Sequence, residues 1–153
     1  MENKDIIIKT AEGADVPSIA RLEQLCFPEA WSEDMILSAM ECGTFYVAAY
    51  DNGQCIGDAG ANVVLDEGQV ANIAVYPEYR GKGLGRALTK AMAERCFNSG
   101  CATVTLEVRH TNTTAISLYD SLGFRAVGRR KDYYRDPKAD GILMTLLKED
   151  YNA

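Results

Sequence analysis

The sequence lacks any long apolar run. No stretch of about 18 consecutive apolar residues occurs in it, so it predicts no membrane-spanning helix. The first residues, Met1 to Asp5, also lack the basic start and the apolar segment of a secretory signal peptide. We therefore expect a cytoplasmic protein that has no membrane partner.

Metal-binding and disulfide patterns are also missing. His110 is the only histidine, and no two cysteines have the C-x-x-C spacing that structural zinc sites use. The five cysteines are Cys26, Cys42, Cys55, Cys96 and Cys101. Their number is odd, and a chain of 153 residues is long enough to build a core without disulfide bonds. We expect no bound metal and reduced, mostly structural cysteines.

Positive charge is in deficit. The chain carries 16 Lys and Arg against 22 Asp and Glu, a net charge of −6 that is unsuited to coating nucleic acid. The same charge can attract a cationic amine or a basic peptide, or serve only for solubility. Hydrophobic residues make up 47% of the chain, which excludes a disordered protein and predicts one globular domain over residues 1–153.

The apolar pattern predicts a mixed sheet flanked by helices, an α/β (α+β) fold. Strands are expected at residues 6–8, 44–50, 55–65, 69–75, 102–109, 124–129 and 142–147. Helices are expected after caps at Asp15, Ser32 and Asn112, and from residue 84 to about residue 98. Two turns join strands, one at residues 51–53 and one at residues 66–68. Gly100 and Gly123 are expected to end helices.

A glycine-rich turn follows the strand at residues 69–75. It reads Arg80-Gly81-Lys82-Gly83-Leu84-Gly85-Arg86 and leads into the long predicted helix. Glycines at alternate positions let successive N–H groups face one concavity, where the positive end of the helix and three cations favour a pyrophosphate. The mononucleotide P-loop pattern is absent. A dinucleotide site stays an alternative, although its third glycine would fall at Arg86, and so does a helix start that binds nothing.

This turn resembles the signature of the GNAT acetyltransferase superfamily, [RQ]-x-x-G-x-[GA] after a strand and a short turn. The resemblance implies a GNAT fold, with about seven strands and about four helices, and acetyl-coenzyme A as co-substrate. It implies that the strand before the turn holds the pantetheine arm and that the loop holds the pyrophosphate. The coenzyme-binding residues so implied are Ile73, Ala74, Val75, Arg80, Gly81, Lys82, Gly83, Leu84, Gly85, Arg86 and Asn112.

A second segment, residues 106–124, sharpens the resemblance. It contains every fixed position of L-E-V-R-x-x-N-x-x-A-x-x-L-Y-x-x-x-G-F, the pattern of the RimI-type branch. Members of that branch acetylate the N-terminal alanine of a small-subunit ribosomal protein. The resemblance therefore implies that the acceptor is a peptide or protein N-terminus and that a ribosomal protein supplies it.

The resemblance assigns two catalytic residues in this segment. An amine attacks a thioester only when it is neutral, so a base must accept a proton, and Glu107 is the candidate. Strand alternation places Glu107 on one face with Thr103 and Thr105. Tyr119 occupies the family position of the acid that protonates the departing thiolate. Each residue also has a structural interpretation: Glu107 as a solvated strand carboxylate, and Tyr119 as part of a packed helical stripe.

The acceptor side matches less well. The RimI-type motif F-P-W-S-E is interrupted here by Glu29-Ala30, so the loop beside the acceptor entrance can differ. We expect Trp31 and Tyr134 near the acceptor. Two alternatives stay open: an enzyme acting on a small amine, a polyamine or a lysine side chain, and a coenzyme A-binding sensor without turnover. Asn112 is expected to act as a helix cap, as a coenzyme contact, or as both.

Overall fold

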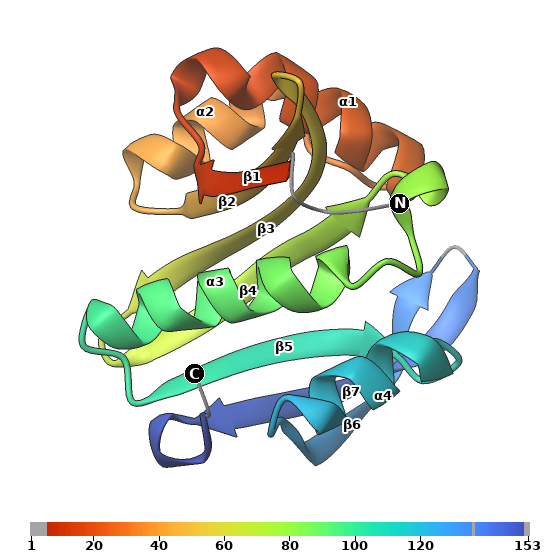
Figure 1. Cartoon of the computed structure of the whole chain (residues 1–153). Helices are drawn as coiled ribbons and strands as arrows, with labels where there is room; N and C mark the ends of the chain where they lie inside the picture. Colours follow the sequence, from red (N-terminus) through yellow and green to blue (C-terminus); the bar gives the residue numbers. More distant parts are fainter. Residues whose placement is uncertain (1–5, 136, 152–153) are drawn as a thin grey trace. The chain divides into compact units, whose positions relative to one another are not determined.

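The structure is a computed structural model that describes residues 6–135 and 137–151. Met1 to Asp5, on which the signal-peptide prediction rests, lie outside the described residues. The chain forms two compact units (Figure 1). Unit 1 comprises residues 1–62 and 71–92, and unit 2 comprises residues 63–70 and 93–153. The single domain expected over residues 1–153 stays a prediction.

The described chain contains seven strands and four α-helices, in the order that the sequence predicts. The strands are β1 (Ile6–Thr10), β2 (Phe45–Asp51), β3 (Gln54–Val64), β4 (Glu67–Val75), β5 (Thr103–Arg109), β6 (Arg125–Arg135) and β7 (Lys138–Leu147). The helices are α1 (Val16–Cys26), α2 (Glu33–Glu41), α3 (Leu84–Asn98) and α4 (Thr113–Ser121). Hydrogen-bonded neighbours in the sheet follow the order β1-β2-β3-β4-β5-β7-β6. Since β4 and β5 are parallel and the β5–β7 and β7–β6 pairs antiparallel, the predicted mixed sheet is confirmed.

Unit 1 is built around the antiparallel strands β1, β2 and β3. Asn52 (φ +50°) and Gly53 (φ +80°) form the predicted turn between β2 and β3. Both central residues have positive φ, which matches the right-handed twist of a hairpin. The predicted Ser32 cap of α2 is confirmed, because its hydroxyl oxygen accepts a hydrogen bond from the Met35 N–H at 3.2 Å. Asp15 stands at the cap position of α1, but its side chain makes no capping bond there and instead accepts the Glu12 N–H.

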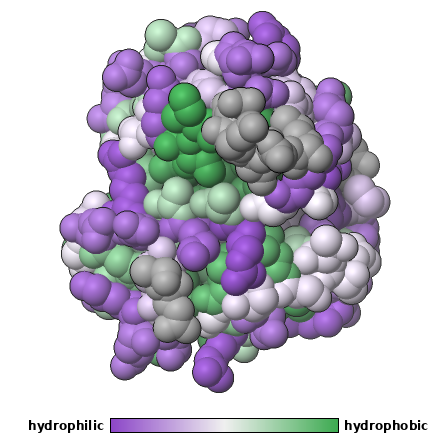
Figure 2. Space-filling view, viewed as in Figure 1, coloured by the Kyte–Doolittle hydropathy of each residue, from purple (hydrophilic) through white to green (hydrophobic). Residues whose placement is uncertain are grey.

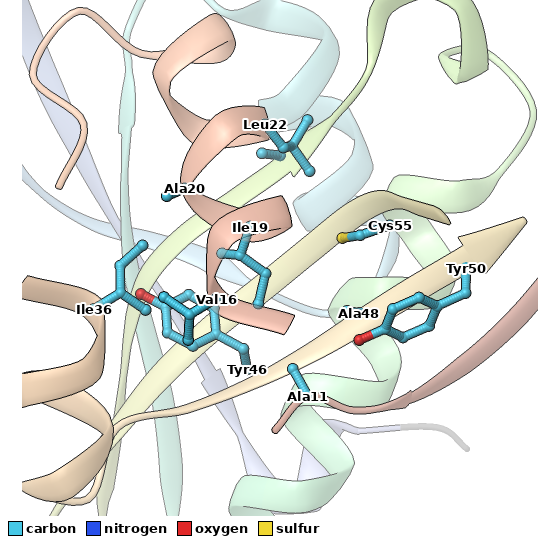
Figure 3. Close-up of a cluster of buried hydrophobic side chains, with 11 residues drawn as sticks. Ala11, Val16, Ile19, Ala20, Leu22, Ile36, Tyr46, Ala48, Tyr50 and Cys55 are labelled. Atoms are coloured by element: carbon cyan, nitrogen blue, oxygen red, sulfur yellow. The ribbon is translucent and has the colours of Figure 1, made fainter. Parts of the chain in front are cut away.

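The core of unit 1 lies between α1 and the inner strands (Figure 3). Val16, Ile19 and Leu22 of α1 are fully buried, at the helical spacing that places them on one face. Tyr46 of β2 reaches beneath them, and its hydroxyl group lies between Val16 and Ile36. All five cysteines of the chain are free, and Cys55 belongs to this core.

Unit 2 is built on β5, β7 and β6, with the first residues of β4 pairing in parallel with β5 from Glu67 to Gln69. Burial alternates strictly along β5, so Val104, Leu106 and Val108 face the interior. The prediction that Glu107 shares the opposite face with Thr103 and Thr105 is therefore confirmed. Asn112 caps α4, because its side-chain oxygen accepts the Ala115 N–H at 3.2 Å.

Several boundaries differ from the prediction, chiefly at the turn before β4 and in the hairpin of β6 and β7, where β7 begins at Lys138 and not at residue 142. The turn between β3 and β4 falls at Leu65 and Asp66, with Leu65 at φ +56°, so the predicted turn at residues 66–68 was wrong. Gly68 instead lies inside β4, where a Cβ atom would meet the Cys96 sulfur at 2.7 Å. Strand β6 continues six residues past the predicted end at residue 129: its polar, exposed last residues still pair with β7 beyond a bulge, which an apolar pattern cannot reveal.

Hydrophilic residues cover much of the face shown in Figure 2, and apolar residues gather on it over β1. Ile7 of β1 has 62% of its surface exposed, which accounts for apolar surface at that strand. No helix in residues 6–135 and 137–151 is long and apolar enough to cross a membrane.

Candidate functional site

The glycine turn of unit 1 presents open backbone. After β4 ends at Val75, a short 3-10 helix (Pro77–Tyr79) leads to Gly81 at φ +79° and Gly83 at φ +82°. A Cβ atom at either glycine would meet no heavy atom within 4 Å. Glycine is therefore required here by the left-handed conformation, and the backbone is open to a ligand. Gly85 does not share this role, because it lies in the first turn of α3.

The turn ends at the N-terminus of α3. The Ala87 N–H donates to the Gly83 carbonyl at 3.1 Å, so the N–H groups of Leu84, Gly85 and Arg86 precede the first bond of the helical ladder. Such groups, together with the helix dipole, favour an anion. The predicted pyrophosphate site thus has the backbone arrangement that its chemistry needs.

Arg80 and Lys82, two cations of the turn, lie against backbone carbonyl groups. Arg80 donates from Nε to the Val75 carbonyl at 2.9 Å, and its Nη2 lies 3.5 Å from the Cys26 sulfur. Lys82 Nζ lies 3.3 Å from the Glu78 carbonyl. Arg80 therefore ties the turn to the end of β4 as well as carrying charge.

The β4 segment before the turn, Ile73 to Val75, is held by β3 and, at the residue just before it, by α1. Gly57 of β3 approaches it so closely that a Cβ atom there would meet the Ala74 carbonyl oxygen at 3.2 Å. Just before the segment, the Asn72 side-chain amide donates to the buried Glu23 carboxyl at 3.2 Å. The segment is thus fixed by packing and by a polar contact to α1.

Glu107 lies in unit 2 with a cation and a phenol beside it. Its Oε2 atom lies 3.3 Å from Arg130 Nε. This oxygen is shielded from solvent and accepts no hydrogen bond from the described residues. Tyr133 lies near the carboxylate, and burial followed by the charge of Glu107 raises the pKa of Tyr133.

A bulge in β6 brings these side chains to Glu107. Arg130 pairs with Gly141 while Tyr134 pairs with Ala139, so β6 carries more residues than β7 between these two pairs. Asp132 in the bulge has φ +53°. Tyr133 packs against Gly141, where a Cβ atom would lie 3.2 Å from the tyrosine ring. Bulges re-aim side chains in this way, and a side chain at position 141 would prevent it.

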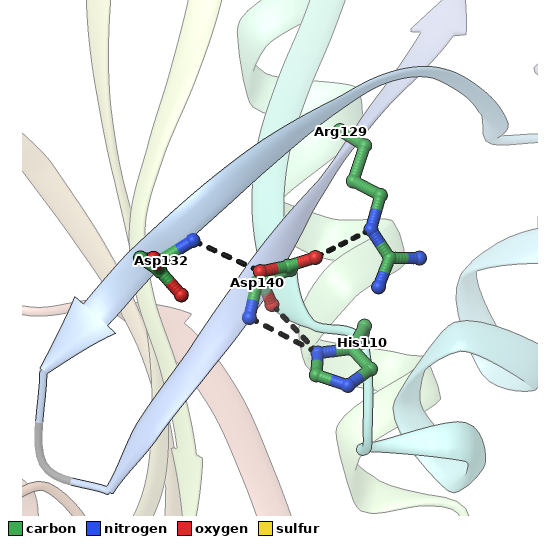
Figure 4. A network of polar contacts seen from close by, with 4 residues as sticks. All are labelled: His110, Arg129, Asp132 and Asp140. Atoms are coloured by element: carbon green, nitrogen blue, oxygen red, sulfur yellow. Dashed lines mark hydrogen bonds and ion pairs between the residues drawn. The ribbon is translucent and has the colours of Figure 1, made fainter.

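A polar network fixes the bulge (Figure 4). Asp140 of β7 accepts hydrogen bonds from Arg129 Nε at 2.6 Å and from the Asp132 N–H at 2.9 Å. These bonds hold the pKa of Asp140 below its ordinary value. The Asp140 N–H donates in turn to His110 Nδ1 at 3.1 Å, which joins the hairpin to the end of β5.

Tyr119 and Tyr134 are neighbours in unit 2. Tyr119 is 8% exposed and packs against Phe124, with ring centroids 5.7 Å apart, so its predicted packing role is confirmed. Burial and the nearby Tyr134 raise the pKa of Tyr119 to about 12. Burial, with smaller effects of Tyr133 and Glu107, raises the pKa of Tyr134 to about 12 as well. The Arg109 guanidinium lies 4.4 Å from the Tyr134 ring centre.

Trp31 belongs to unit 1. It is partly buried against the core of that unit, and it lines a surface hollow of about 320 Å³ with Asp34, Met35 and Ser38. The hollow is lined by the residues just before α2 and by α2 itself. Trp31 therefore combines packing with an accessible face.

Comparison with known proteins decides the family. The model of the Acetyltransferase (GNAT) family matches residues 16–124. The chain belongs to the GNAT acetyltransferase family. The fold and coenzyme implied by the sequence are thereby confirmed: this is an N-acetyltransferase with acetyl-coenzyme A as its acetyl donor. The dinucleotide alternative is excluded.

Particular GNAT relatives resemble the chain along nearly its whole length. It is 38% identical over 141 residues to the ribosomal protein bS18-alanine N-acetyltransferase of Escherichia coli K12, covering 91% of this chain and 95% of that protein. The enzyme of the same name from Haemophilus ducreyi is 31% identical, over 92% of this chain and 99% of that protein. The crystal structure of the E. coli S18-alanine N-acetyltransferase superposes with a TM-score of 0.84 and 37% identity, covering 97% and 96% of the two chains.

Within unit 2 the structure brings together the predicted residues Glu107 and Tyr134 with two residues that the sequence analysis did not single out, Arg130 and Tyr133. The available signal was weak. Arg130 stands in the run Arg129-Arg130-Lys131, which reads as solvated surface charge. The contact follows only from the strand pairing: Arg130 of β6 pairs with Gly141 of β7, and β7 in turn pairs with β5, the strand that carries Glu107.

Proposed function

We propose that this GNAT enzyme acetylates the α-amino group of a protein N-terminus, and that its acceptor is the N-terminal alanine of a small-subunit ribosomal protein. The relatives of that activity support the proposal, because they align along 91% and 92% of the chain. The observation that carries it is the Glu107 carboxylate of unit 2, a partly exposed anion beside two tyrosines, which suits an incoming ammonium group. Five free cysteines support a reducing, cytoplasmic location.

Acetyl-coenzyme A fits the residues of unit 1 that are expected to hold it. Gly81 and Gly83 leave the backbone open, and the start of α3 supplies N–H groups for the pyrophosphate. The backbone of Ile73 to Val75 would hold the pantetheine arm, and Asn112 stays a proposed coenzyme contact. When bound, the coenzyme supplies the acetyl group as a thioester.

Glu107 is proposed as the base. An α-amino group has a reference pKa of about 7.7–8.0, so most of it arrives protonated at neutral pH. The Glu107 carboxylate can attract this ammonium and take its proton, directly or through a water molecule. The neutral amine that results is the nucleophile.

Tyr119 is proposed to stabilise the departing sulfur. With its pKa raised to about 12, the phenol stays protonated at neutral pH and can donate a hydrogen bond. A thiol has a reference pKa of about 8.5, so complete proton transfer from Tyr119 to a thiolate is uphill. We therefore expect Tyr119 to act as a hydrogen-bond donor to developing negative charge, rather than as an acid that transfers its proton outright.

Trp31 and Tyr134 are proposed to border the acceptor. Each has an apolar ring with an accessible part, which suits the short side chain of an N-terminal alanine and the peptide that follows. The Glu29-Ala30 insertion precedes Trp31 directly, so it is the place where acceptor preference can differ from that of the relatives.

An acceptor screen tests the proposal. The purified enzyme is incubated with acetyl-coenzyme A and, separately, with an alanine-initiated peptide of the ribosomal protein, the same peptide with a blocked N-terminus, spermidine and a lysine peptide. We expect acetylation of the free alanine peptide alone, measured by mass spectrometry. Modification of spermidine or lysine without the alanine peptide would show that the acceptor is a small amine or a side chain.

A further inference from the structure

The contact between Arg130 and Glu107 is an ion pair of poor geometry. Arg130 Nε lies 3.3 Å from Glu107 Oε2, which is close enough for charge attraction. Yet Oε2 is shielded from solvent and accepts no hydrogen bond, from Arg130 or from any other described residue. A shielded carboxylate oxygen without a donor is unfavourable, and a better-aligned cation can replace the present one.

Arg129 shows what a well-made pair looks like on the same strand. Its Nε lies 2.6 Å from Asp140 Oδ2 in hydrogen-bond geometry, and the other oxygen of Asp140 accepts the Asp132 N–H. All oxygens of that carboxylate are thus engaged. By contrast, the Arg130 side chain is 56% exposed and is held to Glu107 only by proximity of charge.

Arg130 also has a second partner nearby. Its guanidinium carbon lies 5.8 Å from the centre of the Tyr133 ring, within the range of a cation–π interaction. Tyr133 is itself 47% exposed. A small rotation of the Arg130 side chain can therefore release Glu107 while the guanidinium keeps contact with the tyrosine ring and with water.

We propose that Arg130 is a displaceable counter-ion of Glu107: it occupies the cation position at Oε2 in the free enzyme and yields that position to the ammonium of the acceptor. Arg130 is in this sense a positioning residue that acts through Glu107 and sets acceptor affinity. The inference rests on the proposed function, because it requires that the acceptor amine approaches Glu107.

Displacement makes acceptor binding an exchange of one cation for another. Exposed ion pairs are weak, so removing Arg130 should tighten acceptor binding only about two- to fivefold. The exchange also predicts a salt effect. The native enzyme forms one ion pair while losing another, so its acceptor affinity should be insensitive to salt, whereas without Arg130 the new pair is formed outright and salt should weaken it.

The experiment measures acceptor affinity without turnover. An alanine-initiated peptide of neutral residues with an amidated C-terminus is titrated at pH 7 into enzyme saturated with coenzyme A, which has no acetyl group to transfer. Native enzyme, Arg130→Ala, Arg130→Lys and the control Arg125→Ala, which removes an exposed cation of the same strand that pairs with Asp150, are compared at low and high salt. We expect a Kd two- to fivefold lower for Arg130→Ala at low salt, on the order given by weak ion pairs. That gain in affinity should fade at high salt. It should be absent in Arg130→Lys, because lysine keeps the positive charge beside Glu107.

Two results would overturn the inference. If Arg130→Ala binds the peptide more weakly than the native enzyme, Arg130 contacts the acceptor instead of yielding to it. If Arg130→Ala and Arg125→Ala behave alike, Arg130 has only a structural role. A double-mutant cycle adds the decisive comparison: in a Glu107→Gln background, Arg130→Ala should leave the Kd unchanged, because the carboxylate through which it acts is gone.

Failure of the inference can be told from failure of the proposed function. If the native enzyme neither binds nor acetylates any alanine-initiated peptide, the proposed acceptor is wrong. If it acetylates that peptide but the Arg130 and Arg125 variants have equal affinities, the acceptor is right and only the counter-ion role is wrong.

Discussion

The glycine turn of unit 1 and the Glu107 cluster of unit 2 are built in opposite ways. In the turn, the groups that face a ligand are backbone N–H groups, and Gly81 and Gly83 matter because they carry no side chain. In the cluster, the working groups are side-chain atoms of Glu107, Arg130 and Tyr133, drawn from two strands by a bulge. One region depends on backbone conformation, and the other depends on charge.

This difference predicts that substitutions will separate the two regions. A change of backbone conformation in the turn should affect coenzyme affinity and leave the chemistry of bound substrates intact. A change of charge at Glu107 should do the reverse.

Glu107→Gln should lower kcat by about 10²–10⁴-fold, the usual contribution of a positioned general base. The amide keeps the shape of the side chain but cannot take a proton, so coenzyme Kd should not change. Steady-state kinetics with the alanine peptide and calorimetry with coenzyme A measure the two quantities. Glu67→Gln, at the start of β4, is the control and should have native kcat. An unchanged kcat in Glu107→Gln would return Glu107 to the role of a solvated strand carboxylate.

Gly83→Val should weaken coenzyme A binding by roughly ten- to a hundredfold, because a β-branched residue resists the left-handed conformation and its side chain covers the open backbone. Gly53→Val is a close control, since Gly53 has φ +80° against +82° for Gly83 and equally open surroundings. Both variants should lose similar stability in thermal melts. Only Gly83→Val should lose coenzyme affinity; equal affinity in the two variants would show that the turn does not contact the coenzyme.

The backbone-built region was the easier one to predict from sequence. Its residues are contiguous in the sequence. The spacing of glycines before a helix predicts both the backbone conformation of the turn and its preference for an anion. The same reasoning was wrong at two places. Gly85 was grouped with Gly81 and Gly83 but lies in the first turn of α3. At residues 66–68, a glycine inside a strand was mistaken for a turn glycine. Gly68 is a glycine because of Cys96, a contact that local pattern cannot show.

The side-chain-built region was predicted only in part. Alternation placed Glu107 on the correct face, and the resemblance singled out Tyr119 and Tyr134. Arg130 was missed because its contact with Glu107 depends on the register of β6 with β7, on the bulge at Asp132 and on the space left by Gly141. Each of these is a tertiary feature, and a run of three cations in the sequence indicates solvent exposure instead.

Unit 1 also contains a buried carboxyl group, Asp58 in β3, which can test whether charge matters in this unit. Asp58 and Glu23 are both fully buried, and neither Asp58 oxygen has a hydrogen-bond partner among the described residues. Burial, with the nearby Glu23, raises the pKa of Asp58, and burial raises the pKa of Glu23. One shared proton would let the two carboxyls hydrogen-bond to each other, so we infer that Asp58 stays protonated in the folded state at neutral pH.

Asp58→Asn should therefore stabilise the protein at pH 7, by about 1–3 kcal/mol, because the amide can donate to Glu23 without first taking up a proton. The unfolded state ionises Asp58 above about pH 3.9, so its contribution to native stability is complete below that pH and is lost as pH rises toward the folded-state pKa. The gain from Asn should thus shrink toward pH 4, as measured by denaturant unfolding at several pH values. The exposed Asp120→Asn is the control and should show no such pH dependence. Coenzyme Kd should be native in Asp58→Asn, since β4 presents its backbone and not this charge; a changed Kd would mean that the backbone-built site depends on buried side-chain chemistry after all.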